Sequence, residues 1–182
     1  IWTGIAAATV ILMLAMAPFT ALMPRVVQDH YHRGVGAYGL IFSALAAGMV
    51  AGSLTWAKWH PTRRRVIICF AAFGINDLGI VVLALTPWYP LGLAAAVWRG
   101  FWIGIGIASW TTLLTELVPE HLLSRVFSFD FFGSLGLTPV GYTLAAVVAA
   151  SVAPTTILAA GGAAGALLWF VPLLWRPVRR AA

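Results

Sequence analysis

The sequence predicts an all-α, polytopic membrane protein, and both its composition and its pattern support this fold class. Of its 182 residues, 62% are hydrophobic and only 9% are charged, whereas a soluble domain is about 45–50% apolar and about 25% charged. Eleven basic and five acidic side chains are too few to coat a soluble domain of this size. The apolar residues also fall into long runs without charges. We therefore expect lipid to surround most of the surface.

Six segments are long enough to cross a bilayer, because a helix needs about 20 apolar residues to span ~30 Å of hydrocarbon. They are residues 1–24, 37–57, 66–87, 91–115, 126–150 and 154–175. The connections between them are short, so we expect consecutive helices to pair as antiparallel hairpins.

The basic residues predict the orientation of these helices. They concentrate in the second and fourth connections and at the C-terminus, whereas the other connections carry only Arg25 and Arg33. Lys and Arg favour cytoplasmic loops, so we expect both chain ends in the cytoplasm. The net charge of +6 then reflects topology, and no nucleic-acid partner is expected. The Ala- and Arg-rich composition with a single Lys is typical of a GC-rich bacterium, which predicts the bacterial inner (plasma) membrane.

Proline and glycine mark breaks and close helix contacts. Pro18 lies inside the first predicted span and Pro139 inside the fifth, within the Gly-rich stretch 133–141. An interior proline kinks a helix, and the kink at Pro139 is interpreted either as a gating bend or as a static feature. Three small-xxx-small pairs, typical of packed membrane helices, are Gly48 with Gly52, Gly100 with Gly104, and Gly161 with Gly165.

Two charges lie deep in predicted spans. Asp77 is roughly 16 Å into its helix and Arg99 roughly 12 Å into the next, by the helical rise of 1.5 Å per residue. Ionisable groups at such depth are costly and indicate function by default. We weigh three hypotheses: a structural salt bridge, a functional site in which Arg99 attracts an anionic substrate or Asp77 carries protons, and two residues that never meet.

Arg99 also opens a stripe along its helix. Trp102, Gly106 and either Ser109 or Trp110 follow it at helical spacing and share one face. A cation followed by indoles suits an amphiphilic or aromatic substrate, since small-molecule sites are mostly apolar with few polar anchors. The alternative is that these tryptophans face lipid or pack against neighbouring helices.

A third membrane charge, Asp130, lies only about 6 Å inside its span. From there it can reach Arg125 or the basic cluster Arg63, Arg64 and Arg65. We therefore predict a charge lock between cytoplasmic loops, with an interfacial carboxylate that extends to water as the alternative.

The sequence shows no catalytic motif. It has no HExxH helix, no Gly-rich phosphate loop and no G-x-S-x-G elbow, so we do not expect an enzyme. The single Cys69 excludes a disulfide within the chain. Asp29, His30 and His32 could hold a metal, but a solvated loop is the preferred interpretation. No metal or cofactor is expected, and proton coupling stays open.

Three stretches carry a family pattern. They are Leu22-Met23-Pro24 followed by residues 34–40, residues 113–120 followed by Ser124-Arg125-Val126, and residues 127–134 followed by Thr138-Pro139-Val140-Gly141. These stretches resemble the C-terminal half, helices seven to twelve, of a major facilitator superfamily transporter. The branch that they resemble contains enterobactin exporters and macrolide efflux proteins.

The resemblance implies a secondary transporter that exports a small amphiphilic molecule, drug-like or siderophore-like, by alternating access. It implies that the N-terminal six-helix half is absent from this chain and would be its partner. Two positions depart from the family pattern: the acidic residue of the gating motif is missing, with Trp56 near its place, and Ser124 replaces a glycine. The alternatives are a complete six-helix protein, acting as a homodimeric carrier or a membrane assembly factor, and a membrane enzyme acting on lipid or quinone.

Overall fold

The computed structural model describes residues 12–59, 61, 64–136 and 138–174. This part of the chain is helical and contains no strand. Its elements are η1 (Leu12–Met16), α2 (Ala17–Asp29), α3 (Val35–Trp59), α4 (Arg65–Leu85), α5 (Tyr89–Leu117), α6 (Glu120–Phe131), η2 (Phe132–Gly136), α7 (Thr138–Val148), α8 (Pro154–Phe170) and η3 (Val171–Leu174). The predicted all-α class is confirmed.

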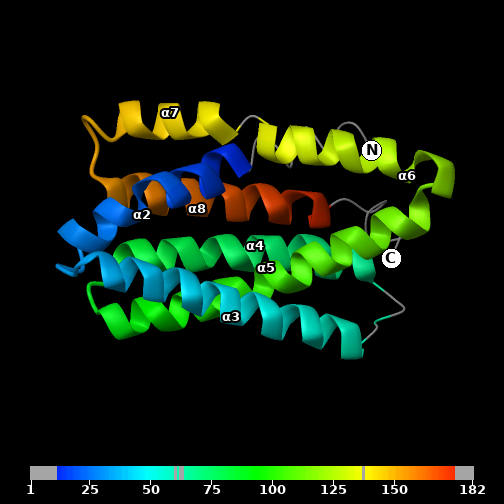
Figure 1. Cartoon of the computed structure of the whole chain (residues 1–182), viewed down its shortest axis with the longest axis horizontal. Coiled ribbons are helices and arrows are strands. Elements are labelled where there is room, and N and C mark those ends of the chain that lie inside the picture. Colours follow the sequence, from blue (N-terminus) through cyan, green and yellow to red (C-terminus); the bar gives the residue numbers. More distant parts are fainter. Residues whose placement is uncertain (1–11, 60, 62–63, 137, 175–182) are drawn as a thin grey trace.

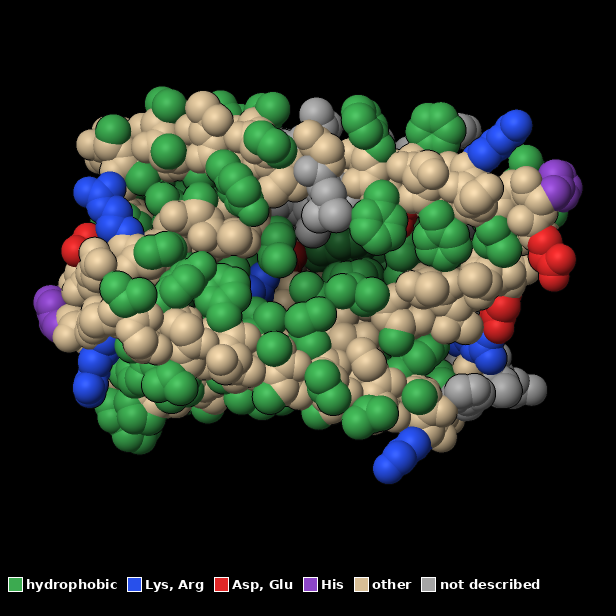
Figure 2. Space-filling view, in the orientation of Figure 1, with side chains coloured by type: hydrophobic (Ala, Val, Ile, Leu, Met, Phe, Trp, Pro, Cys, Tyr) green, Lys and Arg blue, Asp and Glu red, His purple; other side chains and the backbone are tan. Residues whose placement is uncertain are grey.

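Three helices of the described chain are long and apolar enough to cross a membrane, namely α3, α4 and α5. Their bounds differ by only two residues or fewer from the predicted spans 37–57, 66–87 and 91–115. The helices α7 and α8 are apolar but shorter. Figure 2 shows the matching surface, on which hydrophobic side chains cover the middle while charged side chains gather at the two ends of the long axis. The molecule is thus a helical membrane protein.

The first predicted span ended too early. Residues 1–11 of that span lie outside the described residues. The helix α2 continues past Pro24 to Asp29, so the first part of the predicted connection, residues 25–29, is helical. Val26 and Val27, each 1% exposed, pack into the core beyond the proline. Their burial keeps the chain helical where the local sequence favours a stop.

The fifth predicted span, 126–150, is not one helix. It is divided into three elements: α6, the short π-helix η2, and α7. The first of these, α6, begins at Glu120, before the predicted span. Pro139 is the second residue of α7 and therefore starts a new helix instead of kinking a continuous one. The physical reason is that proline is tolerated in the first turn of a helix, where its missing N–H is not needed.

The helices form three groups in Figure 1. The helices α3, α4 and α5 lie together, α2 and α8 lie over them, and α7 and α6 follow one another along the outer side. The closest packing joins α5 to α3 and α4, α4 to α8, and α2 to α7. The main core, which includes Phe19, Met23, Ile41, Ile80 and Leu83, lies between these groups.

Glycines set the distance between α3 and α5. A Cβ on Gly48 would lie 2.8 Å from the backbone nitrogen of Phe101, and one on Gly104 would lie 3.0 Å from the Cα of Met49. Backbone atoms cannot yield as a flexible side chain can, so the two helices approach this closely only because these positions lack a side chain. The predicted packing role of these glycines is confirmed.

Candidate functional site

The centre of the bundle holds a buried carboxylate on α4. Asp77 and the preceding Asn76 are each only 4% exposed. The amide Nδ2 of Asn76 donates a hydrogen bond to Asp77 Oδ1 over 3.0 Å. Asp77 Oδ2 and Asn76 Oδ1 have no hydrogen-bond partner among the described residues. The Trp169 side chain also interacts with the Asp77 carboxylate, so the remaining acceptor capacity of Asn76 and Asp77 is open to a donor at this point.

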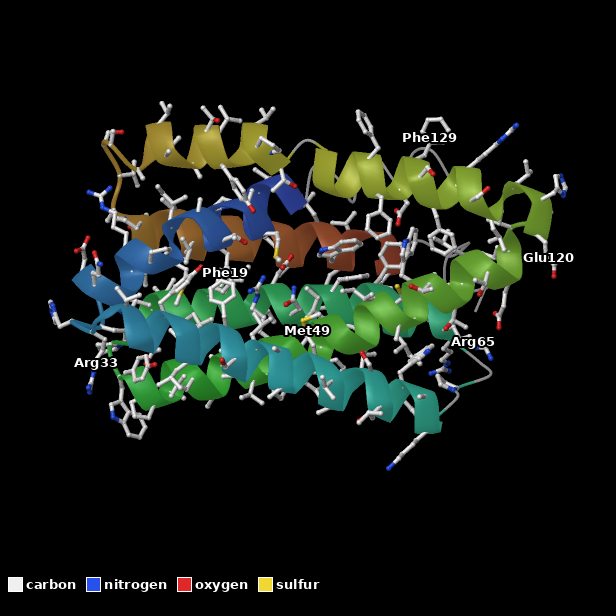
Figure 3. The ribbon with its side chains drawn as sticks, in the orientation of Figure 1. Phe19, Arg33, Met49, Arg65, Glu120 and Phe129 are labelled. Atoms are coloured by element: carbon white, nitrogen blue, oxygen red, sulfur yellow. The ribbon has the colours of Figure 1, made fainter. Side chains whose placement is uncertain are left out.

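A buried guanidinium lies on the neighbouring helix α5. Arg99 is fully buried, with its guanidinium carbon 3.8 Å from the ring centre of Phe19 and its Nη2 3.1 Å from the sulfur of Met16. Figure 3 shows Phe19 pointing from α2 toward this interior. The ring face stabilises the cation, but Nε and Nη1 of Arg99 have no hydrogen-bond partner in the described part of the chain.

Asp77 and Arg99 lie in one cluster without a direct ion pair. The two ion pairs found among the described residues are Arg25 with Asp29 and Arg65 with Glu116. The charges of Asp77 and Arg99 nevertheless act on each other, because α4 and α5 approach closely at Gly79, where a Cβ would lie 3.0 Å from Arg99 Cβ. Of the three hypotheses for these residues, the structure disfavours a closed salt bridge and places both groups in one buried cluster.

A small cavity adjoins this cluster. Its volume is about 30 Å³, which is enough for one water molecule. It is lined by Ala15, Met16, Phe73, Asn76, Asp77, Ile103 and Trp169. A water there could reach the free acceptor atoms of Asn76 and Asp77. The arrangement can therefore hold a proton or a water next to a carboxylate whose charge Arg99 compensates.

The residues of the predicted stripe on α5 have different neighbours. Gly106 packs against Phe73, whose Cε1 would lie 2.9 Å from an added Cβ. Trp102 makes edge contacts with Trp98 and Phe101 at centroid distances of 5.7 and 5.5 Å, and its indole nitrogen has no partner among the described residues. These positions pack against different elements, so their place on a substrate path stays a prediction.

The last residue of the stripe meets the third membrane charge. The indole nitrogen of Trp110 donates to Asp130 Oδ2 over 3.1 Å and so joins α5 to α6. Among the described residues, Asp130 forms no ion pair with Arg64, Arg65 or Arg125. Arg63 lies outside them, so the charge lock with the basic cluster stays a prediction. Asp130 follows Arg125 by five residues, which turns it about 140° around α6, away from that arginine.

One arginine of the basic cluster forms an ion pair with Glu116, an acid that was not among the predicted site residues. Arg65 pairs with Glu116 at the end of α5, and its Nε donates to the carbonyl of Pro61. Arg64 precedes α4 in a left-handed conformation, at φ 61°. The signal was present in the sequence, since Glu116 is an acid at the end of an apolar run that borders the same side as the arginines.

The opposite end of the bundle is held by a loop that was interpreted as solvated. Tyr31 donates to the carbonyl of Leu83 over 2.7 Å, and Nε2 of His30 lies 2.8 Å from the carbonyl of Thr86. These carbonyls belong to the C-terminal end of α4, where helical partners run out. Burial, with a smaller contribution from Tyr89, raises the pKa of Tyr31 to about 12, so its hydroxyl stays a donor.

Comparison with known proteins gives one informative similarity. No family model matches the chain, and no solved structure matches it. The chain is 26% identical over 149 residues to the enterobactin exporter EntS of Citrobacter koseri, in a match that covers 77% of this chain and 36% of the exporter. The chain is thus similar to an exporter. It spans about a third of that relative, and the similarity supports the relationship to major facilitator efflux transporters that the motifs indicate.

Proposed function

We propose that this chain is the C-terminal six-helix half of a secondary transporter, which exports a small amphiphilic molecule by alternating access. The observation that carries the proposal is the similarity to an enterobactin exporter. The apolar helices α3, α4 and α5 agree with it. In this proposal the chain works together with a second six-helix half, and the substrate binds between the two halves near the middle of the membrane.

The charge distribution supports a position in the bacterial inner membrane with both chain ends in the cytoplasm. Arg33 lies at one end of the molecule and Arg65 at the other, which Figure 3 shows. Lys58 in the last turn of α3 and Arg125 within α6 belong to the same end as Arg65. Because basic residues favour the cytoplasmic side, we assign the Arg65 end to the cytoplasm.

The buried cluster supports a role for protons in this transport. Asp77 is about 18 Å along α4, and Arg99 is about 15 Å along α5, at 1.5 Å per residue. Both therefore lie near the middle of the bilayer, where a charged side chain is costly and indicates function. We propose that Asp77 takes up and releases a proton during the cycle while Arg99 offsets its negative charge.

An efflux assay with the intact transporter tests the proposal. Cells or proteoliposomes are loaded with a fluorescent cationic amphiphile, and its efflux is followed after a pH gradient is imposed. We expect Asp77→Asn to abolish gradient-driven efflux, while the matched control Asp29→Asn, an exposed carboxylate on α2, retains it. Efflux that needs no gradient and survives Asp77→Asn would contradict the proton role. Absence of transport of any amphiphile by the wild-type protein would contradict the function itself.

A further inference from the structure

An apolar groove lies between α7 and α8, away from the buried charge cluster. Its volume is about 470 Å³. One wall is the α7 face with Gly141, Leu144 and Val148, and the other is the α8 face with Ala160 and Ala164. Leu14 of η1 and Pro18 of α2 also line it. These residues recur at helical spacing, so each wall is one continuous apolar face.

The length of the groove matches one leaflet of a membrane. From Thr156 at one end to Ala164 at the other, α8 rises about 12 Å, and the hydrocarbon of one leaflet is about 15 Å deep. The end at Thr156 lies beside the turn that joins α7 to α8. The groove therefore runs from the membrane surface to the middle of the bilayer.

A single acyl chain is narrow and flexible enough to lie in a groove of this volume. The walls are apolar, which suits an acyl chain.

A cation lies at the surface end of the groove. Arg25 follows Pro18 by seven residues, or nearly two turns, so both lie on the same face of α2. Its Nη1 is 3.4 Å from the carbonyl of Ala149, at the end of α7. Its side chain is 58% exposed. It forms an ion pair with Asp29 at 3.6 Å, and the Asp29 side chain is 64% exposed. Exposed pairs of this kind are weak, so the guanidinium can bind a phosphate in place of the Asp29 carboxylate.

We propose that this groove binds one anionic phospholipid, with an acyl chain between α7 and α8 and its phosphate on Arg25. The exposed Thr156 lies at the same end and offers a hydroxyl donor to the headgroup. The positive charge of Arg25 favours an anionic headgroup. The length of the groove, close to the depth of one leaflet, favours an acyl chain. This lipid site is independent of the transport proposed above.

Native mass spectrometry of the intact protein tests the site. Delipidated protein is titrated with palmitoyl-oleoyl phosphatidylglycerol or with phosphatidylcholine of the same chains, and the retained copies are counted. Ala160→Phe fills the groove, and Ala51→Phe places the same side chain at an exposed position on α3 as the control. We expect Ala160→Phe to lose one bound lipid and Ala51→Phe to lose none.

A second variant tests the headgroup contact without changing the groove. Arg25→Gln should reduce the preference for phosphatidylglycerol about fivefold, the factor that corresponds to ~1 kcal/mol per basic residue near an anionic surface. Arg33→Gln is the control at the same end of the molecule. Circular dichroism and gel filtration show whether each variant is folded.

Three results would overturn the lipid site. Equal lipid retention by Ala160→Phe and Ala51→Phe would mean that the groove holds no lipid. Equal retention of the two phospholipids by the wild type would remove the assigned headgroup. Displacement of the bound lipid by a fluorescent cationic amphiphile would assign the groove to an exported molecule instead. Because retention is measured without transport, a failed efflux assay leaves this result unaffected.

Discussion

The carboxylate of Asp77 lies directly against Gly165 of α8. A Cβ at Gly165 would be 2.5 Å from Asp77 Oδ2 and 3.0 Å from Ala15 Cβ. The absence of a side chain on α8 is thus what gives the buried carboxylate its place between α4 and α8. The charge cluster and the packing of α8 are one structural unit.

Gly165→Ala should therefore destabilise the protein. The added methyl group must displace the Asp77 carboxylate or separate α4 from α8, and overpacking of this kind costs about 1–3 kcal/mol. Gly39→Ala on α3 is the matched control, because nothing lies within 4 Å of a Cβ there. Unfolding in mixed micelles with increasing SDS measures both variants. Equal stabilities of the two would show that α8 does not press on the carboxylate.

Asp77 and Arg99 should be energetically coupled although they form no direct ion pair. Asp77→Asn or Arg99→Gln alone leaves one buried charge without compensation, which costs about 3 kcal/mol. The double variant leaves no buried charge. Its loss of stability should therefore be smaller than the sum of the two single losses, by about 1 kcal/mol or more. The same SDS titration, applied to the wild type, the two single variants and the double variant, completes the double-mutant cycle. Strict additivity would mean that the two charges do not interact.

Tyr31→Phe should weaken the end of α4. The variant removes the donor to the carbonyl of Leu83, which at the helix terminus has no backbone partner to replace it. We expect a loss of about 1 kcal/mol and faster amide exchange in residues 83–86. Tyr38→Phe is the control, since no described hydrogen bond involves the Tyr38 hydroxyl. A similar change in both variants would point to a general effect of losing a hydroxyl.

Trp110→Phe should loosen α6 from α5. The phenyl ring keeps most of the apolar contact but cannot donate to Asp130, so the half-buried carboxylate loses a charge-assisted bond worth about 1.5–3 kcal/mol. Asp130→Asn keeps an acceptor and should cost less. Proteolysis near α6 measures the loosening. Cleavage that is unchanged in Trp110→Phe would show that other contacts hold this helix.

The contact between Arg65 and Glu116 should be detectable by cross-linking, although it contributes little to stability. Both side chains are partly exposed, at 22% and 49%, so Glu116→Gln should change stability by less than about 1 kcal/mol. In a Cys69→Ala background, Arg65→Cys with Glu116→Cys should cross-link readily with a short bifunctional reagent. The pair Lys58→Cys with Glu116→Cys serves as the comparison, and equal cross-linking of both pairs would contradict the contact.

The sequence by itself determined the helical membrane fold and the three long spans α3, α4 and α5. It also singled out Asp77 and Arg99, because a charge within an apolar run is visible without any partner. These properties are local: the length of an apolar run and the cost of a charge in lipid depend only on neighbouring residues. The glycine pairs belong to the same class, since their spacing alone predicts close packing.

Only the tertiary structure decided which polar groups meet. Trp110 and Asp130 are 20 residues apart, Arg65 and Glu116 are 51, and Tyr31 and Leu83 are 52. No local pattern selects among several donors and acceptors at similar depth, and that is why the sequence alone pointed from Asp130 to arginines and not to the indole of Trp110. The choice depends on helix rotation and on the approach of backbones, which the packing of the whole bundle sets.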